Sequence, residues 1–161
     1  QAQRYIGYKP YNPVTNGVDL SMASTAVPTA EDNNKSASAN SGEVKFTAAG
    51  VRFDYVNRIY VKIVAPSIER VTVSVDGQNL AITKTDSENV YIAYSNGISA
   101  LDFAEKLVFT LSVNGEAVQT LTYTVNDYAL AKSGDAEIGE LSLALYRYGK
   151  STVLYAASVN N

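Results

Sequence analysis

The chain has 161 residues, a length typical of one domain with a buried core. It contains no His and no Cys, which excludes a Ser-His-Asp triad, a thiol nucleophile, a zinc finger and a disulfide framework. There are 13 Lys plus Arg against 16 Asp plus Glu, a net charge of −3, and no basic patch is evident in the sequence. We therefore expect no nucleic-acid partner.

Known ligand motifs are also missing. There is no DxDxDG loop, GxxxxGK or GxGxxG pattern, so neither a metal nor a cofactor is predicted. No run of about 18 apolar residues occurs, so membrane insertion is not expected. The chain begins with Gln1, and we expect a processed product or a piece of a longer protein.

Residues 1–43 are predicted to form an extended arm or linker. Within it, Ser21 to Gly42 is rich in Ser, Ala, Thr and Asn, which bury too little apolar surface to offset the entropy of ordering. Near its start, Tyr5, Tyr8 and Tyr11 stand at a spacing of three around two prolines, a pattern that favours extended chain. We expect these three tyrosines to dock on a neighbouring domain or subunit.

Residues 44–125 read as a series of short strands separated by turns. Apolar and polar residues alternate within them, and Asp76-Gly77 and Asn114-Gly115 are strong signals for two-residue hairpin turns. A short helix is expected to start at Ser99. About eight strands at this spacing predict a mostly β protein with an immunoglobulin-like sandwich. The predicted strands cover 44–46, 51–55, 59–64, 71–75, 80–83, 90–94, 107–113 and 117–125.

Residues 126–161 change to a helical period and form one domain with 44–125. Asp135 is the predicted N-cap, and one face is expected to lie against the sheet. Leu143 and Leu154 are on the other face, where they are expected to meet another part of the molecule or an outside partner. Gly149 either lets another backbone approach or marks a break. The face predicted to be buried comprises Ile138, Leu141, Leu145, Tyr148, Thr152 and Tyr155.

Two stretches resemble a module repeated in large secreted and cell-surface proteins of gut clostridia and ruminococci. Residues 94–129 read YSNGISALDFAEKLVFTLSVNGEAVQTLTYTVNDYA, and the helix reads ELSLALYRYGKSTVLY. Those modules show a "GI-A" turn, a "YSV-DYA" motif and a helix like "LVKALLNYGAAAQ-YF". The resemblance covers about residues 44–158, and the helix departs from it at Lys150-Ser151-Thr152. It implies a sandwich with a closing helix and an extracellular or cell-surface location, and it implies no defined activity.

The carboxylates do not form a catalytic motif. A glycosidase needs two positioned carboxyl groups, whereas the acidic residues here are expected at the surface or in turns, with Asp127 capping the entry to the C-terminal region. We therefore predict no catalytic residue and no enzyme. The carboxylates considered are Asp54, Asp86, Glu88, Asp102 and Asp127.

The 12 tyrosines are the most distinctive feature of the composition. Tyrosine rings stack on sugars and supply contact area at low entropic cost. Most are nevertheless expected to pack in the core, and of Tyr91 and Tyr94 at most one is expected to face outward. Those expected to be buried or half-buried are Tyr55, Tyr60, Tyr123, Tyr148 and Tyr155.

Two functions remain open. The first is a non-enzymatic module of a larger extracellular protein, acting as a spacer, an adhesion unit or a glycan contact. The alternative is a self-assembling structural subunit, such as a virion decoration or fibre protein or a surface-filament subunit, in which the arm mediates assembly. The partner-contact candidates are Tyr5, Tyr8, Tyr11, Leu143 and Leu154.

Overall fold

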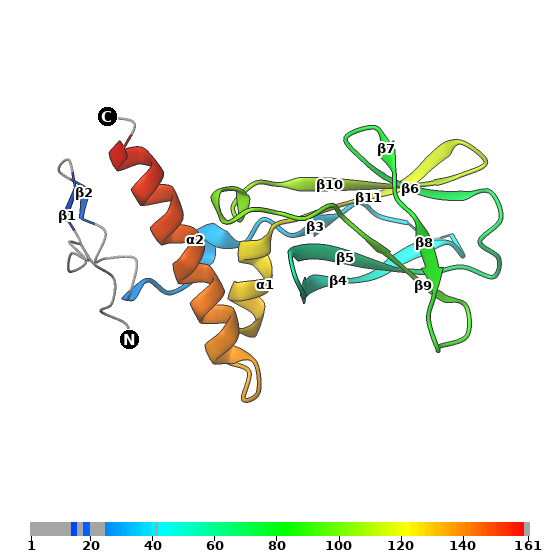
Figure 1. Ribbon diagram of the computed structural model, residues 1–161. Helices are drawn as coiled ribbons and strands as arrows, with labels where there is room; N and C mark the ends of the chain where they lie inside the picture. Colours follow the sequence, from blue (N-terminus) through cyan, green and yellow to red (C-terminus); the bar gives the residue numbers. More distant parts are fainter. Residues whose placement is uncertain (1–13, 16–17, 20–24, 41, 160–161) are drawn as a thin grey trace.

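The computed structural model describes residues 14–15, 18–19, 25–40 and 42–159. The fold is mostly β: two antiparallel sheets face each other as a sandwich, and two helices lie together at one end of it (Figure 1). The predicted fold class is therefore confirmed. The elements are β1 (Val14–Thr15), β2 (Val18–Asp19), β3 (Ser36–Ala37), β4 (Lys45–Phe53), β5 (Asn57–Val64), β6 (Val71–Val75), β7 (Gln78–Asn79), β8 (Ile82–Lys84), β9 (Val90–Tyr94), β10 (Leu107–Val113), β11 (Glu116–Tyr123), α1 (Val125–Lys132) and α2 (Gly139–Val159). Single 3-10 turns cover Ala30–Asp32 and Ala100–Asp102.

The first sheet has the strand order β4-β5-β9-β8. The two runs predicted at 44–46 and 51–55 are one strand, β4, because a register shift between Phe46 and Ala48 absorbs the break in alternation. β5 alternates strictly, with Ile59, Val61 and Ile63 wholly buried. The opposite face of this sheet is therefore turned away from the sandwich core.

The second sheet has the order β3-β11-β10-β6-β7. Both of its predicted hairpin turns are present. Asp76 and Gly77 have φ values of 51° and 78°, and Asn114 and Gly115 have 56° and 80°. Positive φ at both central residues matches the right-handed twist of the flanking strands.

One predicted strand, 80–83, is divided between the two sheets. β7 pairs with β6 in the five-stranded sheet, whereas β8 pairs with β9 in the four-stranded sheet. Between them, the backbone N–H of Leu80 donates to Val73 O at 2.8 Å. The chain thus crosses from one layer to the other within a few residues.

The helix α1 was not predicted, because residues 117–125 were expected to continue as a strand. Thr124 ends β11 with a capping box: its hydroxyl accepts from Asp127 N at 2.9 Å, and Asp127 Oδ2 accepts from Thr124 N at 2.8 Å. Tyr128 of this helix packs edge-on against Phe53 of β4, with ring centroids 5.6 Å apart. α1 therefore lies against the end of the four-stranded sheet.

The long helix α2 packs against α1 and the 3-10 turn at Ala100–Asp102. It was expected to lie against a sheet of the sandwich, and it does not. Asp135 does cap, but its Oδ1 accepts from Glu137 N and Ile138 N one turn ahead of the helix proper. These two hydrogen bonds lower the pKa of Asp135.

The buried face of α2 is rotated from the predicted one. Leu145 is buried as expected, but Leu141, Tyr148 and Tyr155 are more than half exposed. The buried members are instead Gly139, Ser142, Leu145, Tyr146, Gly149 and Ser158.

Gly149 lies inside the unbroken helix α2, where the ring of Phe103 packs against it. A Cβ at this position would lie 2.7 Å from Phe103 Cδ2. The glycine therefore admits a side chain from the loop before β10, and it neither breaks the helix nor makes room for another backbone.

Part of the expected arm is docked on this domain. β3 pairs with β11, and the backbone N–H groups of Asn34 and Lys35 donate to Asp127 Oδ1 at 2.6 and 3.0 Å. Further along, Tyr146 of α2 donates its hydroxyl to Asp32 Oδ2 at 2.9 Å. Hydrogen bonds to backbone and carboxylate groups thus hold a segment that has few apolar side chains.

Candidate functional site

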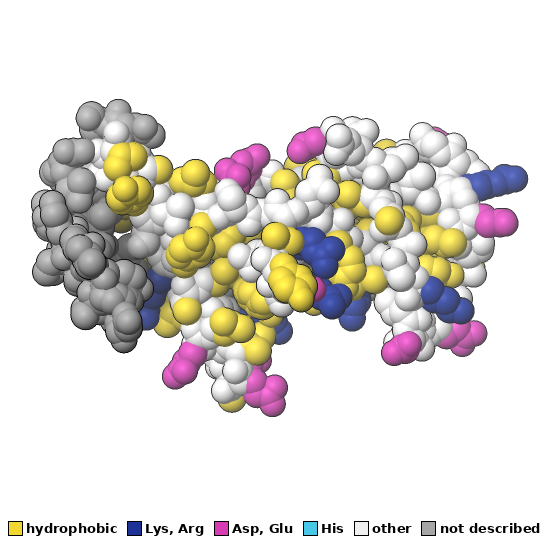
Figure 2. Space-filling model, viewed as in Figure 1, with side chains coloured by type: hydrophobic (Ala, Val, Ile, Leu, Met, Phe, Trp, Pro, Cys, Tyr) yellow, Lys and Arg dark blue, Asp and Glu magenta, His cyan; other side chains and the backbone are white. Residues whose placement is uncertain are grey.

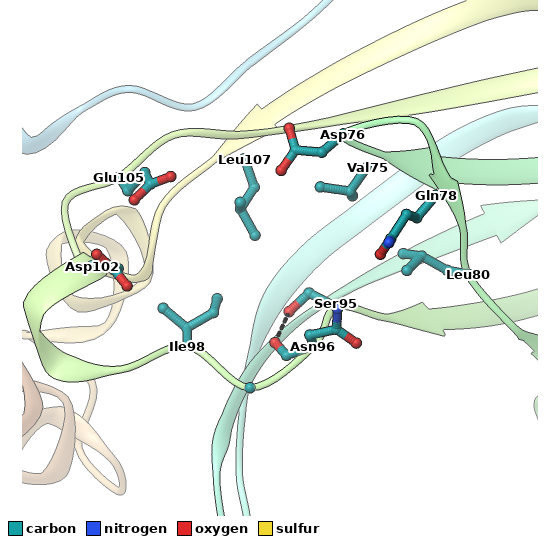
Figure 3. A pocket seen from close by; sticks show the side chains of 11 residues that line it. Val75, Asp76, Gln78, Leu80, Ser95, Asn96, Ile98, Asp102, Glu105 and Leu107 are labelled. Carbon is teal, nitrogen blue, oxygen red and sulfur yellow. Dashed lines mark hydrogen bonds between the residues drawn. The ribbon is translucent and has the colours of Figure 1, made fainter.

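One pocket of about 180 Å³ opens between the ends of the two sheets (Figure 3). Its walls come from the β6–β7 hairpin, from the residues after β9 and from the segment before β10. The apolar side chains are Val75, Leu80, Ile98 and Leu107, and the polar ones are Asp76, Gln78, Ser95, Asn96, Asp102 and Glu105.

Three carboxylates line this pocket, but they do not point toward one common position. In Figure 3, Asp76 lies beside Val75, apart from Asp102 and Glu105, and Leu107 stands between them in this view. Ser95 has the one hydroxyl in this lining that could act as a nucleophile. Its oxygen accepts a hydrogen bond from Ile59 N at 3.0 Å, and its O–H donates to Asn96 O at 2.8 Å, so the hydroxyl is already bonded to backbone as donor and as acceptor. Within the described ranges, no group of three acidic side chains is placed to hold a metal ion.

A second, shallower groove of about 430 Å³ lies where the sandwich meets α2. Tyr55 and Val56 reach it from the β4–β5 turn, and Tyr148 reaches it from the helix. Its floor is formed by Asn57 and the segment 97–100. We call this feature the tyrosine groove.

The two tyrosines of this groove were expected to be buried, and they are not. Tyr55 is 102% exposed and Tyr148 is 61% exposed, although one edge of the Tyr148 ring contacts Phe103 at a centroid distance of 6.4 Å. Tyr155, also expected in the core, is 57% exposed. Tyr60 and Tyr123 follow the expectation, since they are half-buried and buried respectively.

The other two tyrosines named for their strand positions are both half-buried. Tyr91 pairs with Ile63 on the core side of the sheet, and Tyr94 pairs with Tyr60 on the outer side. Only Tyr94 therefore faces outward, as predicted. Burial, followed by the charge of Asp127, raises the pKa of the core residue Tyr123.

Two arginines flank the turn that carries Tyr55. Arg52 of β4 and Arg58 of β5 are directly opposite each other in the register. Asp54 lies between them: its Oδ2 is 3.2 Å from Arg52 Nε and 3.7 Å from Arg58 Nη2. In Figure 2 basic side chains lie beside hydrophobic ones in the middle of the visible face, at this end of β4 and β5.

Tyr94 completes this cluster. Its ring centroid is 4.6 Å from Arg58 Cζ and 5.5 Å from Arg52 Cζ, and Arg52 Nη1 donates to its hydroxyl at 2.9 Å. The hydrogen bond to Tyr94 is the main cause that raises the pKa of Arg52. We call Arg52, Asp54, Arg58 and Tyr94 the arginine cluster.

The cluster belongs to a sheet with an uneven charge distribution. The strands β4, β5, β8 and β9 contain five basic residues and no acidic one. By register, Lys45, Arg52, Arg58 and Lys62 share the outer face, so strand pairing brings together basic residues that are far apart in the sequence. The five basic residues are Lys45, Arg52, Arg58, Lys62 and Lys84.

Of the predicted contact residues, Leu154 lines a groove of about 520 Å³ between α2 and residues 25–32. The side chain of Arg147 reaches the same segment, and its Nε donates to Ala26 O at 2.9 Å. Leu154 therefore faces the segment 25–32 across this groove. Leu143 is half-buried, and Tyr5, Tyr8 and Tyr11 lie outside the described residues.

Sequence reasoning missed the groove and the cluster, but signals for both were present. Arg52 and Arg58 stand at matching positions on either side of the three-residue turn 54–56, so strand alternation places both on one face. Tyr55 stands at the centre of that turn, where a side chain is usually exposed.

Two further sources of information were membrane-spanning helices and similarity to known proteins. None of the described helices is both long and apolar enough to cross a membrane. Comparison with known families, curated proteins and solved structures finds no match for this chain.

Proposed function

We propose that the chain is a non-enzymatic binding module of a larger extracellular protein and that it contacts glycan through the tyrosine groove. One observation carries this proposal: Tyr55 and Tyr148 present exposed rings to a shared groove, from a turn and a helix that are each well anchored. Aromatic rings of this kind stack on sugar faces and lose little entropy on binding.

The groove also has polar groups suited to sugar hydroxyls. Asn57 and Ser99 line it next to the rings. Neither the pocket of Figure 3 nor this groove joins a nucleophile to a general base, so binding without turnover is the function that this geometry favours. The extracellular setting is supported by the resemblance to secreted clostridial modules.

A glycan array, followed by calorimetric titration of any hit, tests the proposal. Tyr55→Ala and Tyr148→Ala should each weaken binding at least about fivefold, since stacking on one ring contributes about 1–3 kcal/mol in comparable aromatic contacts. Tyr155→Ala is the matched control, because Tyr155 is on the same helix and exposed to a similar degree without lining the groove. Equal binding by all three variants would exclude the groove as the contact site.

A second candidate function is self-assembly, and α2 supplies the observation that favours it. Leu141, Tyr148 and Tyr155 are spaced by seven residues and are all more than half exposed. Such a stripe is typical of a helix–helix contact. Light scattering of the full chain tests it: a mass above the monomer that falls in Leu141→Ser and Tyr155→Ser variants would support assembly.

A further inference from the structure

The arginine cluster differs from an ordinary surface ion pair because its charges do not balance. Two guanidinium groups share one carboxylate, and one of the two contacts, at 3.7 Å, is too long for a hydrogen bond. Like charges placed directly opposite each other in a sheet normally destabilise it. The pair therefore has room for a second anion.

Arg58 is the donor left without an acceptor. Among the described residues, its Nε is buried with no hydrogen-bond partner, although the side chain as a whole is 30% exposed. Its guanidinium is held 4.6 Å from the centroid of the Tyr94 ring, which limits its orientations. The buried Nε is out of reach of an outside ligand, so the Nη groups of Arg58 are the donors that a ligand can meet. Held in this way, they form a fixed fork, the geometry that suits a planar carboxylate.

The surrounding surface supports an anion and not a cation. Lys62 is on the same outer face, two residues beyond Tyr60 along β5. The strands of this sheet contribute no acidic side chain. This local excess of positive charge persists in a chain whose net charge is −3. The cluster already accommodates one carboxylate, that of Asp54, against Arg52.

The cluster and the tyrosine groove share one turn. Arg52 and Arg58 flank residues 53–57, and three of those five residues line the groove. A sugar ring stacked on Tyr55 would thus have its substituents within reach of the flanking strands. This continuity links the charge of the cluster to the ligand of the groove.

We propose that the module selects acidic glycans and that Arg58 binds the carboxylate of a uronic-acid residue next to a sugar stacked on Tyr55. This inference rests on the proposed function, since it names the substrate class of the same site.

Titration with oligogalacturonate and with its methyl ester tests the inference, because esterification removes the negative charge and leaves the sugar ring and its hydroxyls unchanged. The unmodified chain should bind the acid at least tenfold more tightly than the ester. Arg58→Gln should bring the two affinities within about threefold of each other, and Arg58→Lys, which keeps the charge and loses the fork, should give an intermediate ratio. Lys84→Gln is the control for loss of one positive charge on the same sheet, and it should keep the preference.

The outcomes separate the two proposals. If Tyr55→Ala weakens binding of both probes while acid and ester bind equally well to the unmodified chain, the glycan function stands and the role of Arg58 is wrong. If Arg58→Gln changes the ratio no more than Lys84→Gln does, Arg58 is not the carboxylate donor. If the unmodified chain binds neither probe, acidic-glycan recognition is wrong, and the array decides the wider proposal. Far-UV circular dichroism of each variant ensures that a loss of binding is not a loss of fold.

Discussion

The two sheets of this sandwich share a core and differ on their outer faces. The outer face of the four-stranded sheet has four basic side chains, those of Lys45, Arg52, Arg58 and Lys62, whereas the only charged side chain in the strands of the five-stranded sheet is Glu116. The outer positions of the five-stranded sheet are filled largely by hydroxyl side chains, which pair across strands, as in Thr110 with Thr120. These residues are Ser36, Thr72, Ser74, Thr110, Ser112, Thr120 and Thr122.

This difference shows which part of the surface follows from folding alone. Cross-strand pairs of Thr and Ser suit a pleated surface and stabilise it modestly. Opposed arginines do not, and the ligand binding that we propose would explain their presence on one sheet. The outer face of the five-stranded sheet therefore shows what folding alone requires, and the outer face of the four-stranded sheet is compared with it.

The largest predicted effect is at Asp127, which holds the edge of the hydroxyl-bearing sheet. It is 4% exposed and accepts hydrogen bonds from the backbone N–H groups of Thr124, Asn34 and Lys35. Asp127→Ala leaves these donors without a partner and should lower the free energy of unfolding by roughly 3 kcal/mol. Urea denaturation measures this loss.

Asp102→Ala serves as the control for Asp127, because Asp102 is exposed and, among the described residues, its carboxylate accepts a hydrogen bond only from the Ser99 hydroxyl, at 3.1 Å. It should change stability by about 0.5 kcal/mol or less. Comparable losses in the two variants would mean that the edge strand β3 contributes little to the sheet.

The hairpins of the hydroxyl-bearing sheet should be the next most sensitive features. Gly77→Ala and Gly115→Ala place a side chain where φ is near 80°, and each should cost about 1 kcal/mol. Gly134→Ala should cost nothing, since its φ is not positive and no atom lies within 4 Å of the added Cβ. Thermal unfolding of the three variants checks this, and equal midpoints would contradict the turn assignment.

A pH effect should appear where the segment that leads into β3 meets α2. Burial, then the hydrogen bond to Asp32, raises the pKa of Tyr146 to about 12, against about 10 in an unfolded chain. A raised folded-state pKa stabilises the protein fully below pH 10, and the contribution is lost as pH rises to 12. The free energy of unfolding should therefore fall more steeply over this range in the unmodified chain than in Tyr146→Phe. A slope that is the same in both would contradict the contact with Asp32.

The smallest effect concerns the glycine of the basic sheet. Gly50 is opposite Tyr60, and a Cβ there would lie 2.5 Å from the Tyr60 hydroxyl oxygen. Gly50→Ala should therefore give no gain in the unmodified chain, but a gain of about 0.5 kcal/mol in a Tyr60→Ala background, where strand propensity alone acts. A double-mutant cycle measures this coupling, and additive effects would show that the ring does not cover the glycine.

Most of the β framework could be predicted because its signals are local. The strands at 71–75, 90–94 and 107–113 match the predicted bounds, and both hairpin turns follow from an Asp-Gly or Asn-Gly pair. These features depend on alternation and on turn chemistry, which a few adjacent residues determine.

The parts that were missed depend on contacts between distant segments. The helical period of 138–155 was evident, but which side of α2 is buried depends on Phe103 and α1, so three apolar residues expected inside are exposed. The start of α1 had a local signal, Thr124 with Asp127 three residues later, that outweighs the strand-like composition before it. The tyrosine groove and the arginine cluster could not be placed before strand register was known.

The passage of the chain from β7 to β8 has a consequence for cooperativity. Because one short segment belongs to both layers, neither sheet can detach without pulling out a strand of the other. The two layers should therefore open in a single event, and amide protons of β6 and of β9 should exchange with the same opening free energy. A molecule built in this way should respond to load or heat as one cooperative unit.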